Sequence, residues 1–103
     1  MTFDEIYDGF FALYQDAEEK NRDAVVTVEE QALYWFYCDF YTTLLRFEKN
    51  REYTQSVEKA FNNFDRNDES SAEKLCTLFF VEKTTLNAVV LFDAVEKIRE
   101  CKQ

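Results

Sequence analysis

The N-terminal segment has the apolar spacing of an amphipathic helix. Thr2, followed three residues later by Glu5, forms a capping-box pattern, which is typical of a helix start. The apolar positions that follow fall within an arc of roughly 120° when successive residues are rotated by about 100°. They are Phe3, Ile6, Tyr7, Phe10, Leu13, Tyr14 and Ala17. The pattern predicts a helix with one face directed to a core and an acidic face opposite.

A second helix is predicted to begin after residues 21–26, where Thr27 and Glu30 repeat the capping-box spacing. Its apolar positions cover an arc of roughly 200°, wide enough to contact more than one neighbour. They are Leu33, Tyr34, Phe36, Tyr37, Cys38, Phe40, Tyr41, Leu44, Leu45 and Phe47. Trp35 projects instead from the polar strip, beside Asp39. Either another part of the chain covers this indole, with the last helix as the leading candidate, or it is an exposed anchor for a partner.

Three further helical stripes follow, separated by breaks. The stripe that starts at Tyr53 is rotated away from the preceding one, so we expect a break or sharp turn at residues 49–52; the alternative is one long helix with two differently directed faces. Residues 65–70 are predicted to be a loop, with Ser70 and Glu73 as a third capping box. A kink or turn is expected at residues 82–85, because Lys83 would otherwise fall on an apolar stripe. The last helix, residues 86–100, is apolar over most of its surface and should pack centrally.

These patterns predict an all-α fold, a compact bundle of four to five helices in a single domain spanning residues 1–103. The chain has no proline and one glycine, so the residues that hairpin turns most often need are scarce. The β-branched and apolar residues at 77–92 leave an alternative, an α+β fold with a hairpin in that segment. Seven side chains are expected in the core: Phe10, Tyr14, Phe36, Phe40, Leu44, Phe61 and Phe79.

Several classes of chemistry are disfavoured by composition. Histidine is absent, which removes the most frequent general base and metal ligand. The single glycine excludes a glycine-rich phosphate loop, and the three cysteines lack the close pairing of a structural zinc site. We therefore expect no enzymatic activity, no cofactor and no metal. Widely spaced cysteines, an acidic start and the lack of a long apolar run favour a cytoplasmic protein rather than a secreted or membrane-spanning one.

Charge is distributed unevenly along the chain. Ten carboxylates and two basic residues precede residue 40, a net charge of −8, whereas eleven acids nearly balance ten bases in the remainder. This sign disfavours direct binding to nucleic acid or to an anionic membrane. It favours stoichiometric binding to a basic surface of a protein partner, because complementary charge speeds association. The candidate binding residues are Asp4, Asp8, Asp16, Glu19, Trp35 and Asp39.

Basic surfaces are common on proteins that handle nucleic acids, which sharpens this interpretation. An acidic inhibitor whose carboxylates stand in for phosphates would act as a DNA mimic, as phage-encoded anti-restriction or anti-CRISPR proteins do. The alternative is structural: a self-associating or adaptor bundle in which a second copy completes the wide aromatic arc of residues 33–47. Tyr34, Tyr37 and Tyr41 would then form the homodimer interface.

Overall fold

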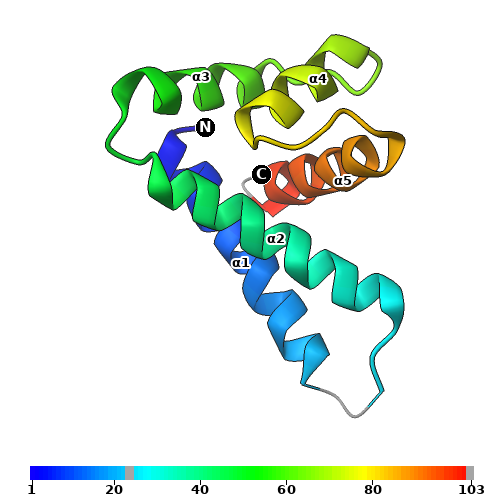
Figure 1. Cartoon of the computed structure of the whole chain (residues 1–103). Coiled ribbons are helices and arrows are strands. Elements are labelled where there is room, and N and C mark those ends of the chain that lie inside the picture. The colour runs from blue at the N-terminus through cyan, green and yellow to red at the C-terminus, as the bar shows by residue number, and fades with distance from the viewer. Residues whose placement is uncertain (23–24, 102–103) are drawn as a thin grey trace.

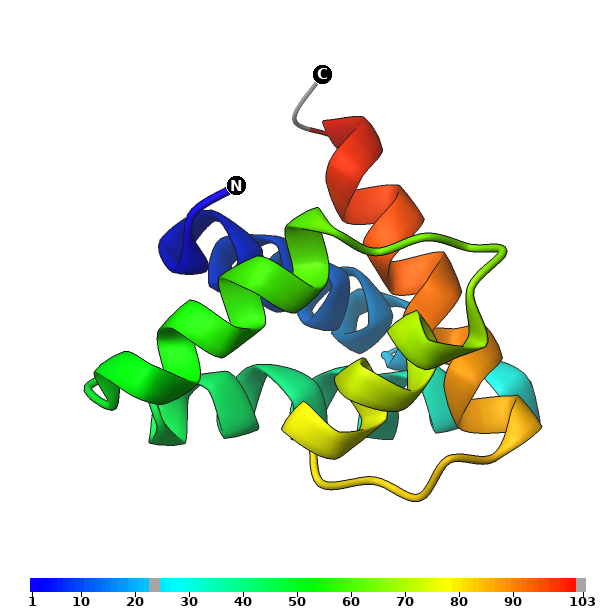
Figure 2. The same cartoon turned by 90° about the horizontal axis from the view of Figure 1, so that it is seen from above.

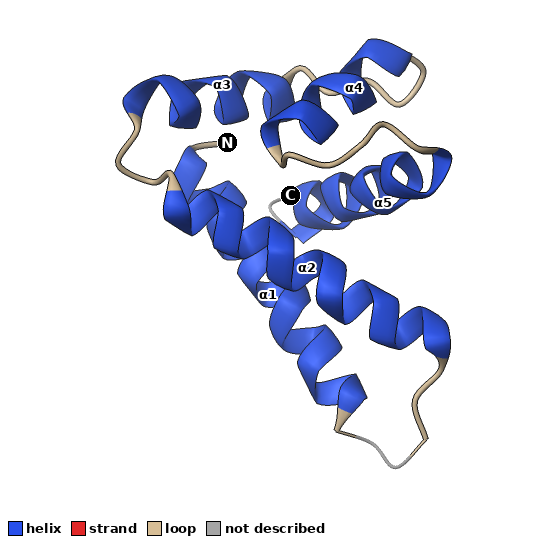
Figure 3. Cartoon of the chain, in the orientation of Figure 1, coloured by secondary structure: helices blue, strands red, loops and turns tan. Residues whose placement is uncertain are grey.

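A computed structural model describes residues 1–22 and 25–101, and within them it contains five helices and no strand (Figures 1 and 3). The helices are α1 (Phe3–Asn21), α2 (Val28–Arg46), α3 (Arg51–Asn62), α4 (Glu69–Leu78) and α5 (Thr85–Cys101). The predicted all-α bundle is confirmed. The alternative hairpin in residues 77–92 is wrong, because that segment contains the end of α4, a connection and the first half of α5.

The five helices form two groups. Helices α1 and α2 make an antiparallel hairpin, which we call the arm, and α3, α4 and α5 pack over one end of it as the lobe (Figure 1). Seen from above, α3, α4 and α5 succeed one another across the arm (Figure 2). The other end of the arm extends past the lobe, in keeping with principal extents of 42 × 27 × 27 Å. The end of the hairpin at which α1 finishes and α2 begins therefore lies outside the lobe.

Phe10 lies at the junction between the arm and the lobe. Its ring centroid is 5.9 Å from that of Phe40 in α2, 6.2 Å from Phe61 in α3 and 5.2 Å from Phe79 at the end of α4. These four side chains and Leu44 are buried, as the apolar pattern predicts. Edge-on ring contacts of this kind add to the stabilisation from apolar burial. The core is therefore built around one phenylalanine that contacts three other helical segments.

Two residues expected in the core, Tyr14 and Phe36, are only half-buried. Tyr14 packs against α2, and its ring centroid is 4.6 Å from that of Tyr41. Phe36 packs against Phe40 at 6.0 Å but sits at the margin of the core. A helical wheel locates both residues on an apolar arc. It does not show that neighbouring helices leave the edges of that arc open.

The helix starts follow the sequence signals with one correction. Thr2 forms the expected capping box with Glu5, and Thr27 caps α2. The predicted break after α2 is confirmed, and Asn50 caps α3. The third capping box is wrong: the α4 cap is Asp68, whose carboxylate accepts from the backbone N–H of Ser70 at 3.0 Å. Hydrogen bonds from the Ser70 hydroxyl and backbone lower the pKa of Asp68.

Helix α4 ends earlier than the sequence pattern predicts. The backbone N–H of Val81 bonds to the carbonyl of Cys76 at 3.0 Å, and that of Phe80 bonds to Thr77 at 3.2 Å. This pair of bonds is a Schellman motif, which places the residue after the cap in the left-handed region. That residue is Phe80, with φ of 58° and 69% exposure. Residues 79–84 then connect to α5, so Lys83 lies outside any apolar stripe.

Helix α5 packs centrally, as expected, and Gly9 sets its distance from α1. Leu91, Ala94 and Val95 are fully buried. A methyl group added at Gly9 would lie 2.6 Å from Cγ2 of Ile98, so only glycine allows this approach of the two helices. At the C-terminal end of α5, the Arg99 guanidinium donates to the carbonyl of Phe61 at 2.6 Å and to that of Phe64 at 3.1 Å.

Candidate partner-binding surface

The acidic residues singled out on α1 lie on its solvent side. Asp4, Asp8, Asp16 and Glu19 are all exposed. Within residues 1–22 and 25–101, the ion pairs involve other acids, namely Glu18, Glu73 and Glu96. The four carboxylates therefore have no cationic partner among the described residues. Their charges contribute to the field outside α1 without being neutralised by a neighbouring ammonium or guanidinium group.

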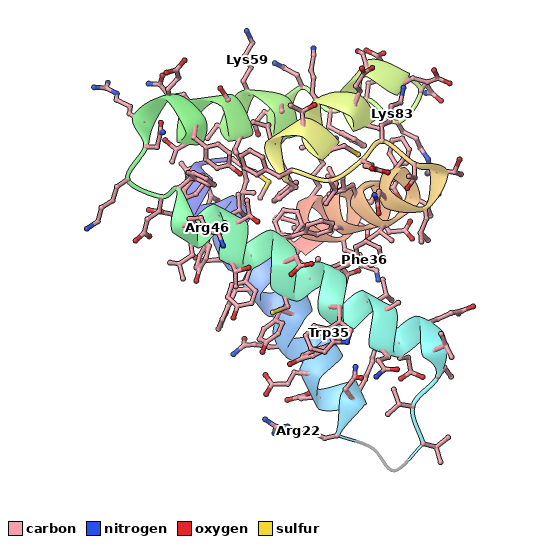
Figure 4. The ribbon with its side chains drawn as sticks, in the orientation of Figure 1. Arg22, Trp35, Phe36, Arg46, Lys59 and Lys83 are labelled. Carbon is pink, nitrogen blue, oxygen red and sulfur yellow. The ribbon has the colours of Figure 1, made fainter. Side chains whose placement is uncertain are left out.

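Trp35 is exposed on α2, with 58% of its surface open to solvent. The expectation that another part of the chain covers it is wrong. Figure 4 shows Phe36 on the side of α2 nearer α5, whereas Trp35 lies on another side of the helix. One edge of the indole contacts Tyr34, with ring centroids 5.2 Å apart, and this contact restricts the side chain. Asp39, one turn further along α2, is also exposed.

A cluster of half-buried rings lies between the two helices of the arm. Phe11 and Tyr41 meet edge-on with centroids 5.3 Å apart, and Tyr14 stacks on Tyr34 at 5.4 Å. Tyr7 stacks on Phe11 at 6.1 Å. We call these five residues the aromatic seam: Tyr7, Phe11 and Tyr14 of α1 with Tyr34 and Tyr41 of α2. Trp35 adjoins the seam through its contact with Tyr34.

The hydroxyl groups of the seam interact with one another. A hydrogen bond between the side chains of Tyr14 and Tyr34 raises the pKa of Tyr14, and burial adds to the shift. Burial and the neighbouring Tyr41 raise the pKa of Tyr7. The rings of Tyr7 and Tyr14 are therefore neutral at physiological pH. Packing holds the seam in place, so its exposed edges form a pre-arranged apolar surface with polar tips.

Tyr37 does not belong to this surface. It is 4% exposed, and its hydroxyl is buried without a hydrogen-bond partner among the described residues. Burial, followed by the nearby Asp93 carboxylate, raises the pKa of Tyr37. The assignment of Tyr37 to a dimer interface is corrected accordingly, because a side chain enclosed by its own fold offers almost no area to a second copy. Tyr34 and Tyr41 keep some accessible area as parts of the seam.

The sequence pattern did not identify Phe11 as a surface residue, nor Tyr7 and Tyr14 as part of a site. A signal was present: Tyr7, Phe11 and Tyr14 follow the i, i+4, i+7 spacing of a second aromatic stripe on α1. Tyr34 and Tyr41 match it on α2 with a seven-residue spacing. Two such stripes on consecutive helices of a hairpin face each other when the helices pack antiparallel.

The described residues contain neither a metal-binding cluster nor a helix that could span a membrane. Among residues 1–22 and 25–101, no group of three or more Cys, Asp or Glu side chains is arranged to hold a metal ion. None of the helices in the same residues has the length and apolar character needed to cross a membrane.

Comparison of the chain with known protein families, with curated proteins and with solved structures finds no match. We therefore base the proposed function on the exposed charges and aromatic rings of the arm.

Proposed function

We propose that this protein is a non-enzymatic, stoichiometric binding protein whose arm docks on a basic surface of a protein partner. The observation that carries the proposal is the set of exposed α1 carboxylates without ion pairs among the described residues, together with an exposed tryptophan on the other helix of the same arm. Carboxylates steer a basic partner to the arm and orient it. Trp35 and the seam supply the apolar contact that provides much of the affinity at an interface.

The partner proposed is a protein that handles nucleic acid, inhibited by occupation of its basic groove. The net charge of −8 before residue 40 supports this, since such a groove is built to attract a dense row of phosphate charges. The mode of action would be that of a phage-type anti-defence or DNA-mimic protein. A cytoplasmic location agrees with three cysteines that form no disulfide.

The test is a pair of charge-reversed variants. In the arm variant, Asp4, Asp8, Asp16 and Glu19 are replaced by Lys. In the matched control, four exposed acids of the lobe are replaced in the same way: Glu52, Glu69, Glu82 and Glu100. Both changes alter the net charge equally, so only the position differs. Partners captured by the immobilised protein are eluted by increasing salt and by competing duplex DNA.

Loss of the captured partner with the arm variant, but not with the lobe variant, is the expected result. The loss should be greatest at low ionic strength, where exposed charges are least screened. Displacement by duplex DNA would support mimicry specifically. Equal capture by both variants would remove the acidic arm as the binding surface, and with it the DNA-mimic proposal.

Self-association remains the alternative, with Tyr34 and Tyr41 at the interface. The incompletely covered aromatic seam favours it, because a second copy would bury the open ring edges. The exposed carboxylates of α1 oppose it, since an isologous pair would bring two negative arms together. Light scattering at low and high salt distinguishes the two functions. A dimer that forms at low salt, where this repulsion is strongest, would favour the structural role.

A further inference from the structure

A crevice runs between α1 and α5, on the acidic side of the arm. It consists of two neighbouring cavities of about 350 and 70 Å³, which share Leu13, Asp16 and Lys97 in their walls. Gly9 and Ala12 line the larger cavity and present little or no side chain to it. Ile98 of α5 forms the facing wall. The larger cavity is thus an apolar slot between two helices and not a wide basin.

The outer cavity has the electrostatics of a cation site. Asp8 and Asp16 both line it and are both exposed, about 12 Å apart along the axis of α1 at 1.5 Å per residue. Cys101, the last residue of α5, lies at the same cavity. The C-terminal end of a helix carries partial negative charge, which adds to that of the carboxylates. Two independent sources of negative potential therefore meet at one apolar slot.

We propose that this crevice receives an arginine side chain of the basic partner, an inference that rests on the proposed function. The aliphatic stem would lie on Ala12, Leu13 and Ile98, and the guanidinium would donate to Asp16 or Asp8. Arginine fits better than lysine because its guanidinium is less strongly hydrated and pairs with a carboxylate through two parallel hydrogen bonds. Leu33 and Glu30 of α2 line the inner cavity as well.

Lys97 is the competing charge at this site. It lines both cavities, and within the described residues no carboxylate lies within ion-pair distance of its ammonium group. Its positive charge would repel an incoming guanidinium and oppose the attraction of Asp16. Removing this charge should therefore strengthen arginine binding, whereas removing Asp16 should weaken it. Substitutions of Lys97 and of Asp16 should therefore change the affinity for arginine in opposite directions.

The experiment is an NMR titration of the intact protein with Nα-acetyl-arginine amide. The matched probe is Nα-acetyl-citrulline amide, which has the same shape without the charge, and Nα-acetyl-lysine amide tests the preference for guanidinium. Saturable shifts are expected at the backbone amides of Gly9, Leu13 and Ile98. The arginine probe should bind about fivefold more tightly than the citrulline probe, the effect of one partly exposed ion pair.

Three variants of the crevice and two control variants locate the binding. Ala12→Leu fills the slot without changing charge and should abolish the shifts, whereas Gln15→Leu, exposed on the same helix outside the crevice, should not. Asp16→Asn should weaken binding and Asp4→Asn should not. Lys97→Gln should tighten it. Circular dichroism checks the fold of each variant, and the Asp16→Asn and Asp4→Asn pair decides the question if Ala12→Leu does not fold.

Equal binding of the citrulline or lysine probe, or shifts that survive Ala12→Leu, would overturn the arginine site. This failure is distinguishable from failure of the proposed function. If the arginine probe does not bind but the charge-reversed arm still loses its partner, the crevice inference alone is wrong. If the probe binds and the arm variant still captures the partner, the crevice is a site without the proposed role.

Discussion

The core and the aromatic seam are both built from ring side chains, yet they use different residues. Around Phe10 the core has only phenylalanines: Phe40, Phe61 and Phe79. The seam has four tyrosines and one phenylalanine, all half-buried. A phenol must satisfy its hydroxyl, so it suits a place where water or another hydroxyl is within reach. The rings of the core are thus fully buried, whereas the rings of the seam form an apolar surface whose hydroxyl groups can reach water.

The two clusters also differ in what they contribute: the core rings stabilise the fold, and the seam rings are available for recognition of a partner. Core rings are enclosed by four helical segments and stabilise the fold through burial. Seam rings are only partly buried, and each keeps some accessible area. Their incompletely buried area contributes less to folding and is available to a partner. Substitutions in the two clusters should therefore have effects of different size and kind.

The largest expected effect contrasts adjacent residues, Phe10 and Phe11. Phe10→Ala should lower the free energy of unfolding by about 3–5 kcal/mol, since it empties the centre of the core. Phe11→Ala should lower it by only about 1–2 kcal/mol, because its ring is only partly buried. Urea unfolding followed by circular dichroism measures both. Equal losses for the two variants would show that the seam is as much a part of the core as Phe10.

Gly9→Ala should destabilise the protein by about 1–3 kcal/mol, although alanine is the better helix former. The new methyl group would meet Ile98, which is buried and cannot swing away. Thermal unfolding measures the loss. Ile98→Ala in the same chain should reduce the additional effect of Gly9→Ala, because it removes the atoms in conflict. A Gly9→Ala variant as stable as the parent would mean that α5 is not held this close to α1.

The helices could be predicted from the sequence because their signals are local. Thr2 and Thr27 cap the helices they were expected to cap, and the break after α2 follows from a rotated stripe. The cap of α4 was misassigned to Ser70 because Asp68 offers an equally good oxygen two residues earlier. A local pattern cannot decide which of two nearby side chains caps a helix when either could accept a hydrogen bond from a backbone N–H of the first turn.

The candidate site could be predicted only in part, because it depends on how the helices pack. The wheel identifies the solvent side of α1, so the exposure of Asp8 and Asp16 was foreseen. It does not give the direction from which the lobe covers the arm. The openness of the seam at Phe11 and the exposure of Trp35 follow from that direction. The burial of Tyr37 follows from it as well.

Alkaline pH should destabilise the protein through its tyrosines. Burial raises the pKa of Tyr53 to about 12, and its hydroxyl donates to the carbonyl of Leu78 at 2.8 Å. The hydrogen bond with Tyr34 raises the pKa of Tyr14 in the seam. In the unfolded chain both ionise near pH 10. Since the folded state holds these protons more tightly, the stability they contribute is complete below about pH 10 and declines at higher pH; the share of Tyr53 is lost as the pH rises through about 12.

Urea midpoints measured from about pH 9 to about pH 12 test this expectation. Tyr53→Phe should flatten the decline by removing the titrating group of the lobe, and Tyr14→Phe should do the same for the seam. A midpoint that stays constant over this range would contradict the shifts. A decline that only Tyr53→Phe reduces would mean that the seam hydroxyls are solvated in the folded protein.

Trp35 should show the smallest effect on stability and a large effect on binding. It is 58% exposed, so Trp35→Ala should change the free energy of unfolding by less than about 1 kcal/mol. If Trp35 anchors the partner, the same variant should weaken binding by about 2 kcal/mol. Because Trp35 is the only tryptophan, its fluorescence follows one site without a label.

The free protein should emit near the wavelength of a hydrated indole, since one edge of Trp35 contacts Tyr34 and the rest faces solvent. Adding the captured partner should shift the emission to the blue as water leaves the ring. A matched Leu45→Ala variant removes another exposed apolar side chain of α2 and should leave binding unchanged. If the partner leaves the emission unchanged and binds Trp35→Ala with the same affinity as the parent, the interface lies away from Trp35. The acidic face of α1 would then be the docking surface.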